Sequence, residues 1–464
     1  MTLSNRTLRL ARYLYHRAPL SQAAKWRMRE KFGPILLALR KAELDGNLLH
    51  HLKHSFNPYL SKNAVDQEAI QRIALRLYAN LAIHCRTYGP LTHIIALPFL
   101  GKGGAERTAL QFARAIAQAK GGRSVSIWIT DRDMVTPDLP VPPHVHVVNL
   151  WQYLPTEAGE ELRLAFLRDC LMTLRPEVFH VINSDLGWKL ICQEGHRLRS
   201  VMRLYGSMFA FQFTPDLAKR IGYAEYYLRQ SIDVLDGLLS DNSRFQVDAI
   251  DIYGLENFRQ KFIPIYNACR IAESEWKSRA QIQLSRVRAA AATNGTMNVL
   301  WAGRLDEEKR VDLLYATAMQ CPDIQFHVYG ESVVGSKHPM PNLANLKYHG
   351  PFGDPTELVD ERVYDAFLFT SRWEGMPNML LEVGALGIPI IAPDVGGVGE
   401  LIDETTGFLV SAQAAPEEYV HALRTIGSSR ELAVGRAAGL LKLIGERHTW
   451  TAFCRRLTEV PNYL

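Results

Sequence analysis

Apolar residues along most of the chain fall into short runs, separated by longer stretches in which they recur every three or four positions. Runs such as 92–100 and 124–130 have the length and apolar content of strands buried on both faces. The stretches between them, for example 104–119, have the period of amphipathic helices. Repeated alternation of this kind predicts mostly parallel sheets with helices on both faces.

The strand runs form two groups on either side of a polar, alanine-rich stretch that predicts a linker helix. We therefore predict an α/β protein with two doubly wound, Rossmann-like domains that face a cleft, where ligands bind at the carboxyl ends of the strands. The predicted strands are 92–100, 124–130, 144–150, 178–184, 200–206, 236–242 and 261–267, then 298–305, 324–330, 346–350, 366–371, 388–394 and 407–410. The predicted parts are a helical basic amino-terminal extension (1–90), a first domain (91–270), a linker helix (271–296), a second domain (297–448) and a carboxyl-terminal helix that crosses back to the first domain (449–464).

The amino-terminal segment differs from the rest of the chain in charge. Residues 1–50 contain ten Lys or Arg and three acidic residues, whereas the whole chain of 464 residues has a net charge of +5. Apolar positions interleave with these charges at helical spacing, which is typical of a basic helix on an anionic membrane surface. A helical cap packed on the main domain would show the same pattern, and both interpretations stay open. No nucleic-acid recognition motif accompanies the charge, so we expect no nucleic-acid partner.

The rest of the composition is that of an ordinary globular protein, with 47% hydrophobic and 22% charged residues. No apolar run approaches the ~20 residues of a membrane span, and no signal-peptide pattern follows the basic start. Six cysteines lie far apart without metal or redox spacing, which indicates a reducing compartment. We expect a cytoplasmic protein, peripheral on the inner face of the membrane if its basic segment docks there.

Two basic residues follow the first strand of the second domain. In "WAGRLDEEKRVDLL" (301–314), Arg304 stands at the carboxyl end of the strand and Lys309 near the first turn of the next helix. An arginine fork, a lysine charge and the partial positive charge of a helix end can together hold a pyrophosphate without a metal ion. Taken singly, either residue is more simply interpreted as a solvated surface charge.

Two glutamates bracket the stretch "EGMPNMLLE" (374–382), which follows the strand at 366–371. Pro377 suits the first turn of a helix, so Glu374 is expected at the strand–helix junction and Glu382 about 7.5 Å beyond Pro377 along the helix. With a diphosphate at the helix end, this spacing predicts a nucleotide sugar, with Glu374 on the sugar and Glu382 on the ribose. The plain alternative is one acid favoured by the helix dipole and a second in solvent.

Longer stretches resemble a known family. "GRLDEEKR", "SRWEGMPNMLLEVGALGIPIIAPDVGGVGELI" and "TGFLV" are similar to the carboxyl half of the family 4 type of retaining GT-B glycosyltransferases (glycosyl transferases group 1), and "GKGGAERTALQFARAIAQ" resembles the glycine loop and helix of its amino half. The resemblance covers about residues 91–450. Its most specific part is the pair Glu374 and Glu382 followed by Gly-Gly-x-x-Glu at 396–400.

The resemblance implies a GT-B fold, a nucleoside-diphosphate-sugar donor, retention at the anomeric carbon, and no metal or cofactor. It implies a saccharide or lipid-linked acceptor, since similar proteins build bacterial surface polysaccharides and glycolipids. Arg304, Lys309 and Glu374 would be the catalytic residues, and Gly103 and Gly104 would let the backbone approach the transferred sugar. The implied donor-binding residues are Gly103, Gly104, Arg304, Lys309, Glu374, Gly375, Met376, Pro377, Asn378 and Glu382.

The chain departs from the family pattern in three places. Arg310 stands where a glycine often follows the lysine, and Gly399 where a proline is frequent. Many members carry a histidine after the fourth amino-half strand, where this chain offers Asn183, Ser184 and Asp185 as acceptor-side candidates. An asparagine can bind a sugar hydroxyl but cannot act as a base.

Three other polar residues receive plainer interpretations. His180 lies inside a strand run and is expected to be a packed strand residue rather than a catalytic one. Asp131 and Asp133 form an Asp-x-Asp pattern that could hold Mg²⁺ or Mn²⁺. They lie in the amino half, away from the expected donor site, so we interpret them as a solvated turn and predict no metal site.

Two classes of function remain as alternatives to a hexosyl-type transferase. One is a GT-B scaffold that binds a sugar nucleotide or a partner without turnover. The other is a GT-B phosphorylase or sugar epimerase, although the cofactor lysine of a phosphorylase has no signature here. The presence of Arg304, Lys309, Glu374 and Glu382 together favours an active transferase.

Overall fold

The computed structural model describes most of the chain from residue 64 onward: residues 64–101, 103–121, 123–137, 139–154, 159–214, 217–290, 296–331, 341–360 and 362–464. The basic segment 1–50, with its membrane and cap interpretations, lies outside these described residues. Contacts divide the chain into two units, and residues 82–156 with 167–464 form the unit that contains both large sheets. Among the described helices, none has the length and apolar content that a bilayer crossing requires.

The first sheet has seven parallel strands in the order β3-β2-β1-β4-β5-β8-β9. Its strands are β1 (Leu91–Leu97), β2 (Ser124–Ile129), β3 (Val145–Asn149), β4 (Val178–Ile182), β5 (Arg203–Ser207), β8 (Gly237–Ser240) and β9 (Phe262–Pro264). Every strand of this sheet was predicted. The antiparallel pair β6 (Gln212–Phe213) and β7 (Arg220–Ile221) was missed, because two residues are too few to show a period.

The second sheet has six parallel strands in the order β12-β11-β10-β13-β14-β15, all of them predicted. They are β10 (Asn298–Ala302), β11 (Gln325–Tyr329), β12 (Leu346–Gly350), β13 (Ala366–Leu368), β14 (Ile390–Pro393) and β15 (Phe408–Val410). The expectation of two doubly wound parallel sheets is therefore confirmed.

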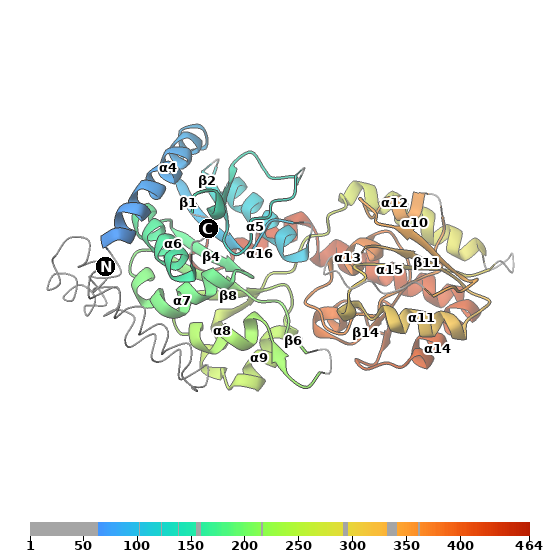
Figure 1. Ribbon diagram of the computed structural model, residues 1–464. Coiled ribbons are helices and arrows are strands. Elements are labelled where there is room, and N and C mark those ends of the chain that lie inside the picture. Colours follow the sequence, from blue (N-terminus) through green and yellow to red (C-terminus); the bar gives the residue numbers. More distant parts are fainter. Residues whose placement is uncertain are drawn as a thin grey trace, which may run out of the picture. The chain divides into compact units, whose positions relative to one another are not determined.

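Helices alternate with most of the strands along the chain (Figure 1). They are α4 (Ala64–Tyr88), α5 (Gly104–Ala119), α6 (Glu160–Leu174), α7 (Asp185–Leu198), α8 (Tyr223–Ser231), α9 (Arg244–Tyr253), α10 (Glu273–Ala290), α11 (Val311–Gln320), α12 (Glu357–Asp360), α13 (Asn378–Ala385), α14 (Pro416–Ser428), α15 (Arg430–Arg447) and α16 (Trp450–Thr458). Helix α10 occupies most of the stretch in which we expected the linker helix.

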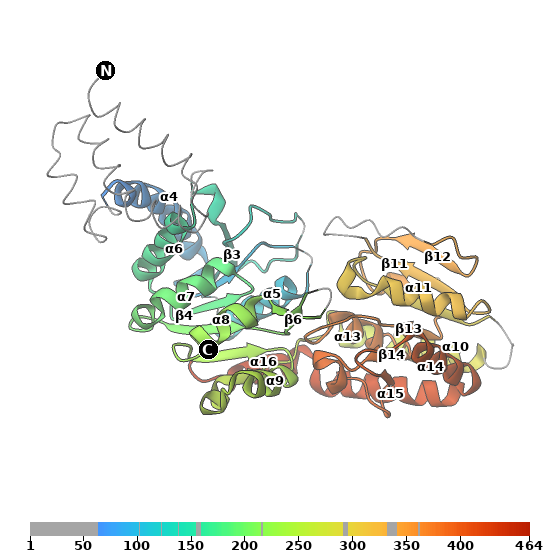
Figure 2. The ribbon, with the colours of Figure 1, turned by 60° about the horizontal axis from the view of Figure 1, so that its bottom comes forward.

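Strand β10 shows why the predicted strands are continuously apolar. Val299 and Trp301 point into one apolar cluster, with residues of α11 and α14, and Leu300 and Ala302 point into another, with residues of α13 and α15. Figure 2 shows this sheet with α11 on one side and α15 on the other. A strand covered on both faces needs apolar residues at every position, not at alternate ones.

Each sheet has a point at which its strand order reverses. In the first sheet this point lies between β1 and β4, and in the second between β10 and β13. The connections leave these neighbouring strands in opposite directions, so the loops at their carboxyl ends are left uncovered. Those loops contain Gly103 and Asn183 in the first domain, and Lys309 and Glu374 in the second.

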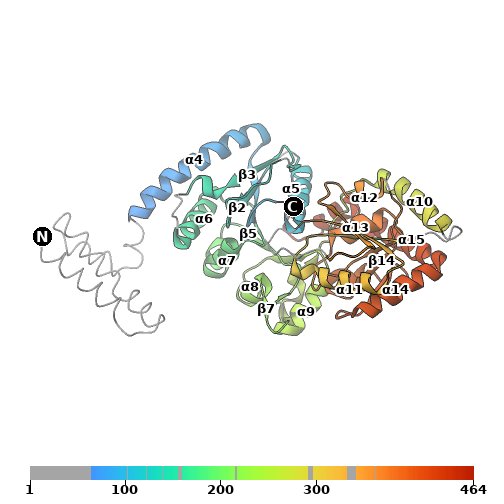
Figure 3. The same ribbon diagram turned by 45° about the vertical axis from the view of Figure 1, so that its right-hand side comes forward.

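The carboxyl-terminal residues pack into the core of the first domain. Phe453 of α16 and Tyr463 lie in one apolar cluster with Ile95 of β1 and Phe112 of α5. Figure 3 shows the carboxyl terminus beside α5. The Tyr463 hydroxyl lies 2.8 Å from Nδ1 of His180, so the last residues of the chain complete the polar pairing of a central strand.

We expect Tyr463→Ala to lower the free energy of unfolding by about 3–5 kcal/mol, because it removes a completely buried ring. Tyr463→Phe keeps the ring but leaves His180 without this partner, and should cost about 1–3 kcal/mol. Urea denaturation followed by circular dichroism measures both. Equal midpoints for Tyr463→Ala and the wild type would show that the terminus does not contribute to the core.

Candidate active site

The glycine loop before α5 lies against the side chain of Glu106, which belongs to the first turn of the same helix. Gly103 is the N-cap residue of α5, and a Cβ there would lie 2.2 Å from a carboxylate oxygen of Glu106. Burial raises the pKa of Glu106, and the positive charges of Arg304 and Arg107 oppose that rise. A Cβ at Gly104 would approach the side-chain amide of Asn378 to 3.4 Å, so the loop lies against the start of α13.

The turn between β10 and α11 presents the two predicted basic residues. Arg304 is about half exposed and pairs with Asp306, at 3.1 Å, and with Glu308. Lys309 ends a single 3-10 turn and pairs with Glu374 from the loop after β13. Two residues 65 positions apart, both predicted for the site, are thus in direct contact.

The stretch 374–378 follows the expected path with one difference. Pro377 is the N-cap residue of α13, one position before the first helical turn in which we expected it. The Gly-Gly loop packs beneath this stretch: the Gly397 N–H donates to the Gly375 carbonyl at 3.0 Å. Gly396 has φ +51°, and a Cβ there would lie 1.9 Å from the Glu374 carbonyl oxygen. The two motifs of the resemblance are therefore one packed unit.

Glu382 is buried rather than solvated, with a side chain only 2% exposed. Its Oε1 lies 3.1 Å from Arg107 of α5 and 3.4 Å from Arg270 of the segment before α10. Burial raises its pKa, and both arginines oppose the rise. Its Oε2 is buried and has no hydrogen-bond partner among the described residues. The plain alternative, a second acid in solvent, is therefore wrong.

Two further carboxylates join the domains and were missed as functional candidates. Asp241 follows β8, is completely buried, and accepts hydrogen bonds from the Asn242 amide at 2.7 Å and from the Met376 N–H. Glu400 accepts from the Arg244 N–H at 2.7 Å and from the Tyr266 hydroxyl at 2.6 Å. Glu400 belongs to the motif at 396–400, which could have identified it, whereas no local pattern distinguishes Asp241.

The acceptor-side candidates receive separate roles. Ser184 is buried and is the N-cap residue of α7: its Oγ accepts from the Gly187 N–H at 2.8 Å and lies 2.7 Å from Thr130 Oγ1. The Ser184 hydroxyl is therefore occupied in the cap of α7, and its role on the acceptor side stays a prediction. Asp185 forms an ion pair with Lys189 and accepts a hydrogen bond from the Tyr227 hydroxyl. Asn183 is partly exposed in a left-handed conformation, φ +52°, at the carboxyl end of β4.

The interpretation of Asp131 and Asp133 as a solvated turn holds for Asp133, which is exposed, and is corrected for Asp131. Asp131 accepts from the backbone N–H groups of Asp185, at 2.7 Å, and Leu186, at 3.1 Å, so its negative charge caps the positive end of α7. Asp133 accepts from the Asn149 amide at 2.6 Å. No group of three possible metal ligands is found among the described residues.

His180 is a packed strand residue, as predicted. Its side chain is buried, with Nδ1 near the Tyr463 hydroxyl and Nε2 2.8 Å from Ser207 Oγ. Burial lowers its pKa to about 3. A ring held neutral between two hydroxyls has no free nitrogen with which to take a proton from an acceptor.

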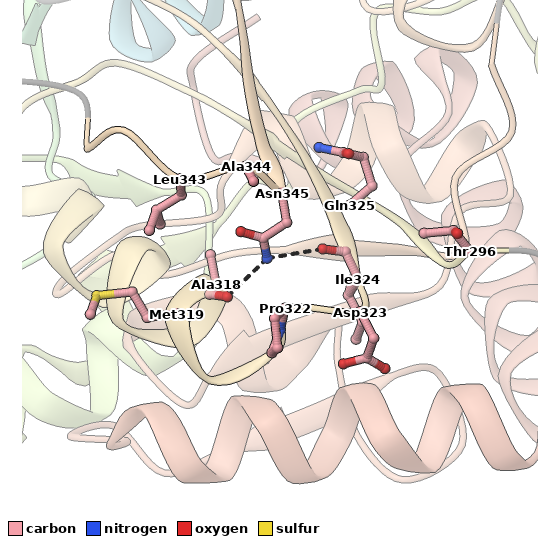
Figure 4. Close-up of a pocket in the computed structure, with 10 residues that line it drawn as sticks. All are labelled: Thr296, Ala318, Met319, Pro322, Asp323, Ile324, Gln325, Leu343, Ala344 and Asn345. Atoms are coloured by element: carbon pink, nitrogen blue, oxygen red, sulfur yellow. Dashed lines mark hydrogen bonds between the residues drawn. The ribbon is translucent and has the colours of Figure 1, made fainter.

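A cavity of about 440 Å³ lies elsewhere, near the amino ends of the strands in the second domain (Figure 4). Gln325, at the first position of β11, lines it, whereas the predicted site lies at the carboxyl ends. Within it the Asn345 amide donates to the carbonyls of Ala318, at 2.9 Å, and Ile324, at 3.1 Å. Its central polar group thus serves the local fold, and the cavity holds none of the predicted residues.

Comparison with known proteins supports the interpretation of this half of the chain. Residues 296–428 match the family model described as "Glycosyl transferases group 1". The O-antigen biosynthesis glycosyltransferase WbnH of Escherichia coli is 33% identical over 114 residues, which are 24% of this chain and 32% of that protein. The chain thus matches about a third of the length of this relative.

Solved structures share the fold over most of the chain. Anabaena HepE, solved in complex with UDP and glucose, gives a TM-score of 0.61 at 16% identity over 80% of this chain and 100% of that one. Sucrose-phosphate synthase from Thermosynechococcus elongatus gives a TM-score of 0.60 at 18% identity, over 80% and 98%. These likenesses confirm the predicted GT-B fold.

Arg310, which replaces the frequent glycine, has φ +53° and begins α11 in the left-handed region. An L-residue pays about 1–2 kcal/mol there, and glycine does not. We expect Arg310→Gly to be more stable than Arg310→Ala by about 1 kcal/mol, although both lose the ion pair to Asp312. Thermal denaturation compares the two variants. An alanine variant as stable as the glycine variant would contradict the strain.

Asp241 should make stability depend on pH. Burial raises its pKa to about 7, the Asn242 amide and the Met376 N–H oppose the rise, and the charges of Glu374 and Glu400 add to it. Because the unfolded value is about 3.9, the folded state keeps a proton that the unfolded chain loses, so stability falls as pH rises between these values.

The uncharged variant Asp241→Asn lacks this dependence. Its melting temperature relative to the wild type should therefore rise from pH 5 to pH 8. Asp251→Asn, on the exposed side of α9, is the matched control for loss of a carboxylate. If the difference in melting temperature between the wild type and Asp241→Asn stays constant from pH 5 to pH 8, Asp241 holds no buried proton.

Proposed function

We propose that the protein is a glycosyltransferase that moves a sugar from a nucleoside-diphosphate-sugar to a hydroxyl of an acceptor. The observation that carries this proposal is the contact between Lys309 and Glu374 at the strand reversal of the second domain. It brings a cation suited to a diphosphate against a carboxylate suited to sugar hydroxyls. The match of residues 296–428 to glycosyl transferases group 1 supports the same reading.

In the proposed reaction Arg304 and Lys309 stabilise the negative charge that develops on the departing diphosphate. The bond between the anomeric carbon and the diphosphate oxygen breaks, and the acceptor oxygen forms its bond on the same face. Because the new bond forms on the face that the diphosphate leaves, the configuration is retained without a protein nucleophile. The departing oxygen takes the acceptor proton. The positive charges of Arg304 and Lys309 take the place of a metal ion. Loss of one such charge should raise the barrier by about 3 kcal/mol, as for a lost oxyanion donor.

The two glutamates have separate tasks in this proposal. In the structure Lys309 is neutralised by Glu374. A bound diphosphate would take over Lys309 and leave Glu374 to accept from hydroxyls of the donor sugar. Glu382 would accept from the ribose hydroxyls, and its buried Oε2, which has no partner among the residues that the structure describes, is the atom that such a ligand would satisfy.

The relatives suggest the biological setting. WbnH is named for O-antigen biosynthesis, and HepE binds UDP and glucose. We propose a UDP-sugar as donor and a saccharide or lipid-linked acceptor in surface polysaccharide or glycolipid synthesis, on the cytoplasmic side of the membrane. The excess of seven positive charges in residues 1–50, which lie outside the described residues, supports docking at an anionic leaflet.

Release of nucleoside diphosphate from a panel of nucleotide sugars tests the proposal. The purified protein should turn over at least one donor, with EDTA causing no loss. Arg304→Ala and Lys309→Ala should each lower kcat by about 10²–10³-fold at unchanged melting temperature. Arg288→Ala, which removes a half-exposed charge from α10, is the matched control.

Each contrary result has a definite meaning. Wild-type rates in both Arg304→Ala and Lys309→Ala would overturn the diphosphate assignment. Restoration by Mg²⁺ after an EDTA loss would overturn metal independence. Donor binding without any nucleotide release would favour the scaffold without turnover.

A further inference from the structure

Glu382 lies in the second domain, yet the groups that hold it come from outside that domain's sheet and helices. Arg107 belongs to the second turn of α5, and Arg270 to the segment that leads from β9 to α10. Both guanidinium groups approach the same carboxylate oxygen, Oε1, at 3.1 Å and 3.4 Å. Oε2, the oxygen that the proposed function assigns to the ribose, is left without a partner in the described residues.

This one-sided pairing differs from an ordinary buried ion pair. Arginine–carboxylate pairs are frequently bidentate, with two parallel hydrogen bonds that satisfy both oxygens. Here two arginines pair with one oxygen, and the second oxygen is buried with no hydrogen-bond partner in the part of the chain that the structure describes, which costs free energy. This arrangement leaves one acceptor position of Glu382 open.

The positions of the two arginines are themselves fixed by a set of contacts. Thr108 Oγ1 donates to Asn267 Oδ1 at 3.1 Å, and Gln111 exchanges hydrogen bonds of 2.8 Å and 3.0 Å with the backbone of Ala268. These bonds join α5 to the segment that carries Arg270. Arg107, one helical turn before Gln111, is thereby held beside Arg270, where both side chains reach Glu382 of α13.

We propose that Arg107 and Arg270 are positioning residues that hold Glu382 turned so that Oε2 meets the ribose hydroxyls of the donor. This inference rests on the proposed function. It adds that nucleotide affinity, although its direct contacts lie in the second domain, depends on a side chain of the glycine-loop helix in the first.

Ribose hydroxyls can be removed from the ligand, which gives the test. Affinities of UDP, ADP and GDP are measured by calorimetry, and the one that binds is compared with its 2′,3′-dideoxy form. In the wild type, removing the hydroxyls should weaken binding by about 10–100-fold, the range for hydrogen bonds to a charged group. In Arg107→Ala the ratio of the two affinities, with and without the ribose hydroxyls, should fall to about twofold, because the Glu382 carboxylate is no longer held in the orientation that binds them.

Further variants separate positioning from folding. Arg107→Lys should restore much of the affinity ratio, and Glu382→Gln should abolish the effect of the ribose hydroxyls. Arg270→Ala should lower the ratio less than Arg107→Ala does, because the Arg270 contact with Glu382 is longer. Arg114→Ala is the control, since Arg114 lies on the exposed side of α5 and stacks over Trp450 at 4.4 Å. If Arg107→Ala does not fold, Arg270→Ala and Arg107→Lys give the comparison.

Two failures are distinguishable. If Arg107→Ala weakens UDP and its dideoxy form by the same factor, so that the ratio remains that of the wild type, Arg107 has only a structural role and the inference is overturned while the proposed function stands. If the wild type binds no nucleoside diphosphate, the proposed function is overturned and the inference with it.

Discussion

Parallel strands all end at the same edge of a sheet, and the reversal of strand order decides which of those ends stay uncovered. In the second sheet the reversal lies between β10 and β13, so the turn at 303–310 and the loop at 369–377 lie side by side. The pairing of Lys309 with Glu374 follows from that topology. The same reversal in the first sheet places the glycine loop beside the residues after β4. The chemistry we propose is located by this constraint before any single side chain is considered.

Three carboxylates then connect the two halves of this unit. Glu382 forms an ion pair with Arg107. Glu400 accepts a hydrogen bond from the Arg244 N–H, and Asp241 accepts one from the Met376 N–H. Glu382 and Asp241 are buried, and a buried carboxylate without donors would be costly, so these two groups require the other half to be in place. Two of the three touch the stretch from 374 to 382, directly or through its backbone. The geometry of the proposed donor site is therefore a property of both domains together.

Several polar residues that resemble site residues instead complete the ends of helices. Ser184 and Asp131 both satisfy N–H groups at the start of α7, and His180 is enclosed by hydroxyls from a neighbouring strand and the carboxyl terminus. Helix ends and central strands at a strand reversal need such partners, because their backbone and ring nitrogens are buried there. Position near the site is thus weak evidence for a role in catalysis.

The sequence by itself determined the strands of both sheets, the α/β class and the loops that carry Arg304, Lys309 and Glu374. These features leave local traces: a strand buried on both faces is a continuous apolar run, and a loop after such a strand is read directly from the chain. Only the tertiary structure decided that Glu382 is buried against Arg107, that Asp241 holds the Met376 N–H and that Ser184 is a helix cap. Contacts between α5 and α13 join residues 275 positions apart, and the packing that brings such residues together has no period along the chain from which it could be read.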